Sequence, residues 1–532
     1  MLRLLSLKIK VEEENLEKKI CEFLKINQRD LIHYNIIKKS IDARRKDQIY
    51  FVYVLDVSLK NEKKVLNKVK KNLVKSPQVN YCLPPYGNKP LHHRPVIIGF
   101  GPSGMFAGLL LSQMGLKPII FERGEEVNSR INTIQNFWEN RVLNPESNIQ
   151  FGEGGAGTFS DGKLNTRVKD LRSQYVLQAF VDHGANPDIL TAYNPHIGTD
   201  VLVGVVKNIR EKIISNGGEI YFNSKLNDIL IKNGKIQEIV VNNETIKVND
   251  LILAIGHSAR DTFSMLYQKG IHIKQKAFAV GVRIEHPQLL INKAQYGNKY
   301  CQYPKLGAAE YKLTYHASNR KSVYTFCMCP GGMVVPSSSE ENTVVVNGMS
   351  EYKRDQVNAN SALVCTVDSE DFEDDHPLSG MYFQQKLEEK AFHLGGNDYN
   401  APIQLVDDFL KNRSSIKLGF VKPSYPIGYK FSNLNTLFSE NIAFALREAI
   451  IELNKKLHGF SLEDAVLTGV ETRTSSPIRI LRDVHNLESI NVSGLYPTGE
   501  GAGYAGGITS SAIDGIKVAE KIISKYRLDD KN

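Results

Sequence analysis

The first ninety residues combine two periods of hydrophobic and polar positions. Apolar side chains recur at three- and four-residue spacing from Leu16 to Leu24, which is the period of an amphipathic helix. The run from Ile49 to Val54 is β-branched and aromatic, as expected of a strand. The pattern predicts strands at 2–11, 32–43, 48–59 and 79–83 and helices at 14–26 and 62–72. This β-α-β-β-α-β order is typical of a ferredoxin-like α+β domain, which we expect over residues 1–90.

A different pattern, with short apolar strands and longer helices, begins at Pro95. It predicts a strand at 96–100, a helix at 104–114 and a strand at 118–121, which is the start of a Rossmann-like α/β domain. Scattered strands and many turns follow, so we expect an inserted substrate or cap domain. The predicted division is 95–270 for the first part of the nucleotide-binding domain, 271–430 for the cap and 431–532 for the C-terminal part of the nucleotide-binding domain. The predicted fold class is therefore mixed α/β and α+β.

Composition and charge narrow the classes of function. The 532 residues are 42% hydrophobic and 23% charged, as in ordinary soluble proteins, and no apolar run approaches the ~20 residues that span a bilayer. Six cysteines without framework spacing favour a reducing compartment. We therefore expect a cytoplasmic protein without membrane insertion. Residues 1–94 hold 21 Lys/Arg and 10 Asp/Glu, so the net charge of +9 arises there; we interpret this excess as a solvated surface, with RNA binding by this domain as the alternative.

Gly99 to Gly104 form the motif G-x-G-x-x-G between a predicted strand and a predicted helix. In this motif the first glycine permits a tight turn, the second lets the backbone approach a pyrophosphate, and the third packs the helix against the strand. The helix N-terminus then offers free N–H groups to the diphosphate. The next strand ends in Glu122, at the spacing of the acid that binds ribose hydroxyls. The sequence therefore predicts a dinucleotide site.

Two later glycine clusters indicate which dinucleotide is bound. A strand predicted at 251–255 ends in Gly256 and His257, and the glycine-rich segment from Gly499 to Gly507 opens the final helix. Helix-end N–H groups stabilise the negative charge that develops on a flavin during reduction, and an NAD-only dehydrogenase needs no second glycine helix. We therefore predict one bound FAD. The residues expected around it are Gly99, Gly101, Pro102, Ser103, Gly104, Glu122, Arg123, Arg130, Gly155, Ala156, Gly157, Thr158, Ser160, Lys163, Leu226, Ala254, Gly256, His257, Gly499, Glu500, Gly506, Gly507 and Ile508.

The chain resembles the bacterial FAD-dependent, or NAD(FAD)-utilising, dehydrogenases whose function is uncharacterised. Nearly the whole chain takes part in the resemblance, which is carried by the strings Ser40 to Arg44, Gln150 to Lys163, Gly256 to Asp261, Phe326 to Gly332 and Glu471 to Pro477. The architecture is similar to FAD folds of the geranylgeranyl-reductase and hydroxybenzoate-hydroxylase type. The resemblance implies FAD and a cap domain but no particular substrate. It also implies that Thr158 and Ser160 contact the ribityl chain or ring, and that Lys163 stabilises the reduced flavin.

Cys327-Met-Cys329 ends an apolar strand of the expected cap domain. Two cysteines beside a flavin can form a redox couple or supply a nucleophilic thiolate; the alternative is a pair of structural cysteines. We expect the two thiols to point to opposite faces of the strand, so that one faces the ring. No partner Cys-x-x-Cys motif or close histidine pair accompanies this Cys-x-Cys, so we expect no metal site.

Basic and titratable residues supply further catalytic candidates. Arg473 and Arg479 flank a Ser/Thr run, where a guanidinium is suited to capture a carboxylate or phosphate. His257 closes a glycine turn, and Arg283, Glu285 and His286 form a second cluster. Histidine is the best proton donor near neutral pH. For each group the alternative is a structural ion pair or a capped turn.

These motifs together predict an FAD-dependent oxidoreductase that transfers a hydride between FAD and a small organic substrate. NADH, NADPH or a protein is the expected electron donor. Two alternatives remain open: a flavin-dependent RNA-modifying enzyme, which the basic N-terminal domain and the two cysteines favour, and a non-enzymatic flavin-bound redox sensor.

Overall fold

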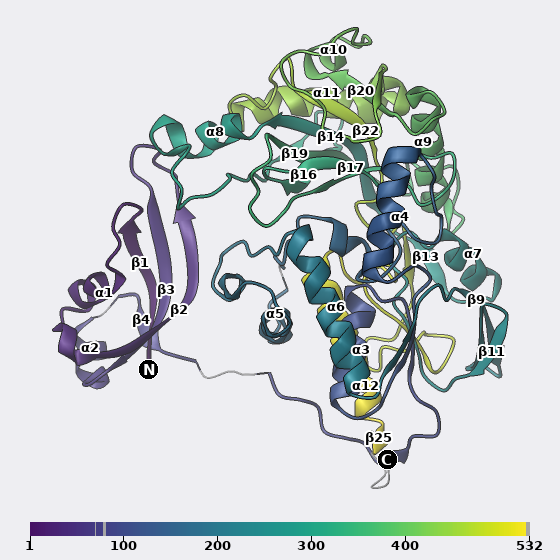
Figure 1. Cartoon of the computed structure of the whole chain (residues 1–532), viewed down its shortest axis with the longest axis horizontal. Helices are drawn as coiled ribbons and strands as arrows, with labels where there is room; N and C mark the ends of the chain where they lie inside the picture. Colours follow the sequence, from purple (N-terminus) through teal and green to yellow (C-terminus); the bar gives the residue numbers. More distant parts are fainter. Residues whose placement is uncertain (70, 78–80, 167, 528–532) are drawn as a thin grey trace.

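The computed structural model describes residues 1–69, 71–77, 81–166 and 168–527. Its N-terminal sheet domain (purple) stands to one side of a larger body (Figure 1). In that body, a parallel sheet with its helices forms the lower part and a second large sheet forms the upper part. No helix within the described residues is both long and apolar enough to cross a membrane.

The N-terminal domain is a four-stranded antiparallel sheet with the strand order β2-β3-β1-β4. This order and connectivity are ferredoxin-like, as predicted. Its elements are β1 (Leu2–Lys10), α1 (Leu16–Leu24), β2 (Leu31–Asp42), β3 (Tyr50–Leu59), α2 (Glu62–Lys68) and β4 (Leu73–Lys75), with a 3-10 turn at Gln28–Asp30. The predicted strand at 79–83 is misplaced: β4 reaches β1 directly after the short α2, residues 79 and 80 lie outside the described part, and Tyr81 to Leu83 form no strand.

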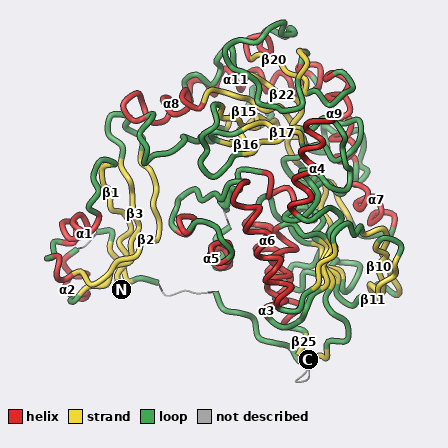
Figure 2. The backbone as a smooth tube through the Cα atoms, viewed as in Figure 1, coloured by secondary structure: helices red, strands yellow, loops and turns green. Residues whose placement is uncertain are grey.

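The second domain is built on a five-stranded parallel sheet with the order β24-β12-β6-β7-β8. Its strands are β6 (Val96–Ile98), β7 (Ile119–Phe121), β8 (Glu219–Tyr221), β12 (Leu251–Leu253) and β24 (Leu495–Pro497). Helices cover one face of this sheet, and the antiparallel β9 (Leu226–Lys232), β10 (Lys235–Val241) and β11 (Glu244–Lys247) cover the other (Figure 2). The helices of this domain are α3 (Pro102–Gln113), α4 (Val127–Asn140), α5 (Arg172–Asp182), α6 (Thr199–Ser215), α7 (Arg260–Gln268) and α12 (Ile508–Ile523), with 3-10 turns at Gly155–Phe159 and Pro187–Leu190.

Burial on both faces explains why the strands of this sheet read as uninterrupted apolar runs. Ile97 and Ile252 point into the core beneath the helices, whereas Val96 and Leu251 point into the core beneath the small antiparallel sheet. Neighbouring residues of a strand face opposite sides, so both sides must be apolar. The carboxyl ends of β6, β7 and β12 consequently meet at one edge, where α/β sheets of this kind bind ligands.

The cap domain is a seven-stranded mixed sheet with the order β15-β16-β19-β14-β22-β20-β21. Its strands are β14 (Phe278–Pro287), β15 (Thr314–His316), β16 (Ser322–Cys329), β19 (Asn358–Val367), β20 (Ala401–Leu405), β21 (Tyr429–Phe431) and β22 (Val466–Glu471). Its other elements are α8 (Gln288–Tyr300), the hairpin β17 (Met333–Pro336) and β18 (Val346–Met349), α9 (Ser379–Gly395), α10 (Val406–Leu410), a 3-10 turn at Leu434–Leu437, and α11 (Glu440–Lys456). The expected end of the cap at residue 430 is too early, because β22 pairs with β14 in the middle of this sheet.

Three short pairings tie the domains together. β13 (Ile273–Gln275) pairs with β23 (Ile478–Ile480) where the chain enters and leaves the cap, and β5 (Lys89–Pro90) pairs with β25 (Tyr526–Arg527) in the linker. Lys39 of β2 forms an isolated bridge with Ala192. The N-terminal domain is thus bound both to the FAD-side loops and to the cap, with which it shares one apolar cluster.

Candidate functional site

A cavity of about 940 Å³ lies where the edge of the parallel sheet meets the cap sheet. Such a volume is typical of a site for a cofactor or drug-sized ligand. Its lining comes from the ends of β6, β7 and β12, the glycine-rich loop at residues 152–163, the segment before α12, the cap strands, and Lys38 of the N-terminal domain. Of the residues predicted around the cofactor, it includes Gly99, Gly101, Pro102, Ser103, Glu122, Arg123, Gly155, Ala156, Gly157, Ser160, Lys163, Leu226, Ala254, Gly256, His257, Glu500, Gly506, Gly507 and Ile508.

The glycines of the G-x-G-x-x-G motif are required by the backbone. Gly99 has a φ of +96°, and a Cβ there would lie 2.4 Å from the Ala254 carbonyl oxygen. A Cβ on Gly104 would lie 2.0 Å from the Gly99 oxygen, so α3 packs against the strand only with glycine at this position. Gly101 precedes α3 without a side-chain cap. The N–H groups at the start of α3 are therefore available to a phosphate.

Glu122 is the acid at the end of β7. Its carboxylate accepts hydrogen bonds from the backbone N–H groups of Phe100 (2.7 Å), Gly124 (3.0 Å) and Gly152 (2.9 Å). An ionised carboxylate offers about four acceptor positions, so one position is left toward the cavity. Glu122 therefore fixes the glycine turn and still has room for a ribose hydroxyl.

Arg130 has a different place from the one predicted. Its guanidinium is fully buried and donates to the carbonyl oxygens of Asn148 (2.8 Å), Ile149 (3.0 Å), Glu153 (2.7 Å) and Gly155 (3.1 Å). It does not line the cavity; instead it holds the glycine-rich loop in shape. Thr158 is also buried behind the loop, and its hydroxyl donates to the Glu153 carbonyl oxygen.

The segment before α12 presents open backbone to the cavity. Cβ atoms built on Gly506 and Gly507 would meet nothing within 4 Å, and Gly507 precedes α12 without a side-chain cap. Gly499 has a φ of +75° and donates its N–H to Asp514 (2.8 Å), which fixes the turn behind the cavity wall. A second helix N-terminus therefore faces the cavity, beside that of α3: a Cβ on Gly157 would lie 3.1 Å from Ile508 and 3.7 Å from Pro102.

These features fit FAD. Two helix N-termini that lack side-chain caps, an acid at the end of the second strand, and a glycine loop between them match a diphosphate, a ribose and a ring that becomes anionic when reduced. The open space in front of Gly256, Gly506 and Gly507 is space that a Cβ would enter. The fold and the site together define a flavoprotein.

Cys327 lines the cavity, whereas Cys329 is fully buried. In a regular strand, residues i and i+2 lie on the same face. The prediction that an extended strand turns the two thiols to opposite faces is therefore wrong. Cys327 and Cys329 differ in exposure because β16 is bulged between Phe326 and Cys329, with Cys327 at a φ of +43°. The Cys329 thiol donates to the Cys327 carbonyl oxygen (3.3 Å), and the neighbouring Cys329 thiol, with the charges of Lys163 and Arg283, holds the pKa of Cys327 below its usual range.

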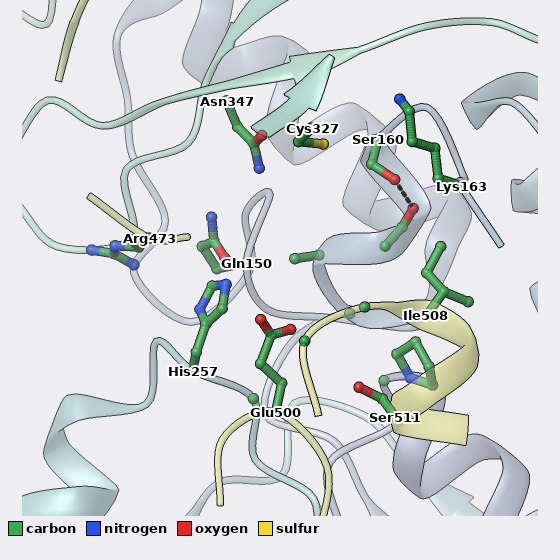
Figure 3. A pocket seen from close by; sticks show the side chains of 18 of the residues that line it. Gln150, Ser160, Lys163, His257, Cys327, Asn347, Arg473, Glu500, Ile508 and Ser511 are labelled. Atoms are coloured by element: carbon green, nitrogen blue, oxygen red, sulfur yellow. Dashed lines mark hydrogen bonds between the residues drawn. The ribbon is translucent and has the colours of Figure 1, made fainter. Parts of the chain in front are cut away.

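Lys163 lines the cavity, as predicted for a residue near the cofactor, and its ammonium is held by protein groups. Its ammonium donates to Asp161 (2.6 Å) and contacts the Met328 carbonyl oxygen, so it joins the glycine-rich loop to the strand that carries the cysteines. Figure 3 shows its nitrogen pointing toward that strand, away from Ile508 at the start of α12. Lys163 therefore supplies positive charge to Cys327, and the Ser160 hydroxyl bonds within its own loop to the Gly157 oxygen (2.7 Å).

Two buried polar groups of the cap line the cavity without a hydrogen-bond partner for one atom each. The atoms are Oε2 of Glu471 and the hydroxyl of Tyr311, and these two residues are 3% and 6% exposed. Buried polar atoms are normally satisfied, so both point to a polar ligand in this end of the cavity. Burial raises the pKa of Glu471 to about 7, although the Arg283 guanidinium lies 3.5 Å away.

His257 and Glu500 face each other near the cofactor end (Figure 3). Burial, together with the Arg473 and Arg260 guanidinium groups, lowers the pKa of His257 to about 3, so it is neutral near pH 7 and is not the predicted proton donor. Burial raises the pKa of Glu500 to about 7. The group suited to exchange a proton near neutral pH is therefore Glu500 rather than His257.

The remaining catalytic candidates serve mainly in structure. Arg473 lines the cavity but is paired with Glu388, and Arg479 donates to the Gly503 oxygen (3.0 Å) outside the lining. The cluster of Arg283, Glu285 and His286 lies inside the cap sheet: Glu285 accepts from Ser424, and His286 contacts the Phe460 oxygen (2.8 Å). Within the described residues, no group of three His, Cys, Asp or Glu is placed to hold a metal ion.

Sequence reasoning missed several lining residues. They include Lys38, Gln150, Asp161, Asn347 and Glu471. Gln150, Asp161 and Glu471 lie within strings that already carry the family resemblance, which was a usable signal. Nothing in the local sequence distinguishes Lys38 or Asn347, because only the packing of separate domains brings them to the cavity.

Comparisons with known proteins agree with this site. Residues 277–474 match the family model described as FAD-dependent protein, C-terminal domain-like, and residues 1–58 match a domain of unknown function, DUF8436. An uncharacterised protein of Clostridium beijerinckii is 53% identical over 515 residues, which is 96% of each chain. The chain belongs to the same family as this clostridial protein, a family of FAD-dependent proteins, and FAD is its cofactor.

Solved structures are similar at a lower level. A geranylgeranyl bacteriochlorophyll reductase-like protein from Thermoplasma acidophilum is 12% identical, with a TM-score of 0.33 over 80% of this chain and 77% of that chain. The halogenase PltM is 11% identical, with a TM-score of 0.36 over 80% and 67%. Scores of this size carry no argument, so the fold assignment rests on the sheet orders given above.

Proposed function

We propose that this protein is an FAD-dependent oxidoreductase that transfers a hydride between FAD and a small organic substrate held against the cap. The observation that carries the proposal is the continuous cavity of about 940 Å³, which joins the glycine cradle to two polar groups of the cap, Glu471 and Tyr311, that each have an atom without a hydrogen bond. When bound, FAD supplies a centre that accepts or delivers two electrons. The cap residues beyond it then form the substrate end of the cavity.

The residues of the chain have separable tasks in this proposal. The start of α3 binds the diphosphate, and the start of α12 stabilises the negative charge of the reduced flavin. The cap sheet covers the reacting centre, because Tyr311 and Thr325 line the cavity from β15–β16 and the residues before them. Covering the centre excludes water and fixes the substrate against the cofactor.

Proton exchange falls to the two carboxyl groups with raised pKa. Glu500 lies at the cofactor end and Glu471 at the cap end, and burial raises the pKa of each to about 7. A group with a pKa near the working pH is the most effective general acid or base. We assign Glu500 to proton exchange with the substrate, since it lines the cavity beside His257 (Figure 3).

The N-terminal domain contributes to the mouth of the cavity. Lys38 of β2 lines it and stacks on Tyr193, with Nζ 4.3 Å from the ring centroid. This placement supports a role of the basic domain in admitting a polar or acidic substrate. RNA modification remains the alternative, and retention on heparin with a steep salt dependence would favour it.

The test follows the flavin absorbance of the purified holoprotein without oxygen. NADH or NADPH is expected to bleach it, and a small organic acceptor found by screening should restore it. Glu500→Gln should retain FAD but slow reoxidation by about 10²-fold or more, whereas the exposed Glu370→Gln should match the wild type. Indifference of the flavin to both nicotinamides, to protein donors and to every acceptor would instead identify a non-enzymatic sensor.

A further inference from the structure

The two cysteines of β16 have the arrangement of a reactive thiol with a buried partner. Cys327 is partly exposed to the cavity, and Cys329 is fully buried with its Sγ 3.3 Å from the Cys327 carbonyl oxygen. Dithiol oxidoreductases use the same division, with an accessible thiolate as the nucleophile and a second thiol to complete the disulfide.

The backbone at Cys327 is strained. A φ of +43° is uncommon for a residue with a Cβ, and strain of this kind costs about 1–3 kcal/mol and is concentrated at functional sites. It has a geometric effect, since Cα atoms two residues apart in a straight strand are roughly 6.6 Å apart. That separation is close to the ~6.8 Å limit for a disulfide. The bulge at Cys327 turns the chain away from this extended limit.

The charges around Cys327 favour a thiolate. Lys163 contacts the carbonyl oxygen of Met328 between the two cysteines, and Arg283 donates to the Cys327 oxygen (2.6 Å). Negative groups lie nearby as well: Asp161 is neutralised by Lys163 and Arg354, and Glu471 and Glu500 hold raised pKa values. The charges of Lys163 and Arg283 outweigh these groups, because the pKa of Cys327 lies below its usual range.

We propose that Cys327 and Cys329 form a redox-active dithiol that exchanges two electrons with the bound FAD. In the oxidation, the Cys327 thiolate and the Cys329 thiol form an S–S bond and release two electrons and one proton. Oxidised FAD takes up the two electrons and the proton, so the charges and atoms balance. The reverse reaction opens the disulfide. This inference rests on the FAD site and goes beyond the proposed organic substrate.

A reductive titration tests the proposal. The holoprotein is first oxidised with diamide, freed of reagent, and titrated with dithionite without oxygen. Wild-type protein should consume about twice as many electrons per FAD as Cys327→Ser or Cys329→Ser, because each of these variants lacks the disulfide. The matched control is Cys365→Ala, a buried cysteine of β19 outside the cavity lining, which should behave like the wild type.

A second measurement does not depend on the flavin signal. After diamide treatment, the proteolytic peptide that contains both cysteines should be lighter by two hydrogen atoms and resist alkylation until it is reduced. Equal electron uptake by the wild type and both serine variants, with two alkylatable thiols after oxidation, would overturn the proposal. Neither readout needs a substrate, so failure of the proposed organic reaction would leave both results unchanged.

Discussion

The Arg473 guanidinium and the Glu388 carboxylate form a buried ion pair, with Nη2 3.0 Å from Oε2. Arg260 binds the same carboxylate, with its Nη2 2.8 Å from Oε1. Arg260 opens α7 of the FAD domain and Glu388 belongs to α9 of the cap. One buried negative charge therefore fastens the two domains together at the wall of the cavity.

Replacement of Glu388 should be costly. Glu388→Gln leaves the buried Arg473 without a counter-charge and Arg260 with Glu340 alone, and loss of one partner from a buried pair typically costs about 3–5 kcal/mol. Urea unfolding should show a loss of this size, whereas Glu389→Gln, an exposed neighbour on the same helix, should lie within about 0.5 kcal/mol of the wild type. A loss below about 1 kcal/mol would contradict the role given to Glu388.

Substitutions of the first two glycines of the G-x-G-x-x-G motif should have different effects. Gly99→Ala forces a Cβ against the Ala254 oxygen at a φ of +96°, so the protein itself should be destabilised by about 1–3 kcal/mol. The Cβ of Gly101→Asp meets only an ordinary contact with Gly155 at 3.7 Å, and its carboxylate enters the phosphate site. That variant should keep its circular dichroism but lose bound FAD at least about 10-fold. Yellow, FAD-saturated Gly101→Asp protein would be inconsistent with the site.

Stability of the apoprotein should depend on pH through Glu471. Burial raises the pKa of this carboxyl from 4.5 to about 7, so the folded state binds the proton more tightly than the unfolded state. The associated stability is fully present below pH ~4.5 and is lost as the pH rises through about 7, a change of about 3 kcal/mol. Glu471→Gln should remove this part of the pH slope in urea unfolding, and Glu370→Gln should not. Parallel slopes for all three proteins would contradict it.

Removal of the N-terminal domain should leave FAD binding intact but lower the stability of the cap domain. A chain that starts at residue 77 keeps the linker, in which the Tyr81 hydroxyl donates to Glu520 (2.8 Å), and it should still bind FAD. It loses Val11 and Phe51, which share an apolar cluster with Tyr300 of the cap. Each large side chain contributes about 1.5–3 kcal/mol when buried, so thermal unfolding should begin at a lower temperature. Loss of FAD from this truncated protein would contradict the proposed domain division.

The sequence alone determined the local features of this protein. The glycine motif, Glu122 and the segment from Gly499 to Gly507 were readable because backbone constraints at a phosphate site act within a few residues. The ferredoxin-like order was readable because hydrophobic periodicity reports each strand and helix separately. The strand predicted at 79–83 and the cap end predicted at residue 430 are wrong because the segments concerned are too short to show a hydrophobic periodicity.

Tertiary structure decided which groups meet at the cavity. Lys38, Asn347 and Glu500 come from three domains, and their distances depend on packing that no local pattern records. The pKa values were equally inaccessible, because burial beside Arg473 and Arg260 reverses the role expected of His257. The same holds for Cys327, which lines the cavity while Cys329 stays buried. Local geometry depends on residues that are neighbours in the sequence. Desolvation and the proximity of charges arise only when distant segments fold together.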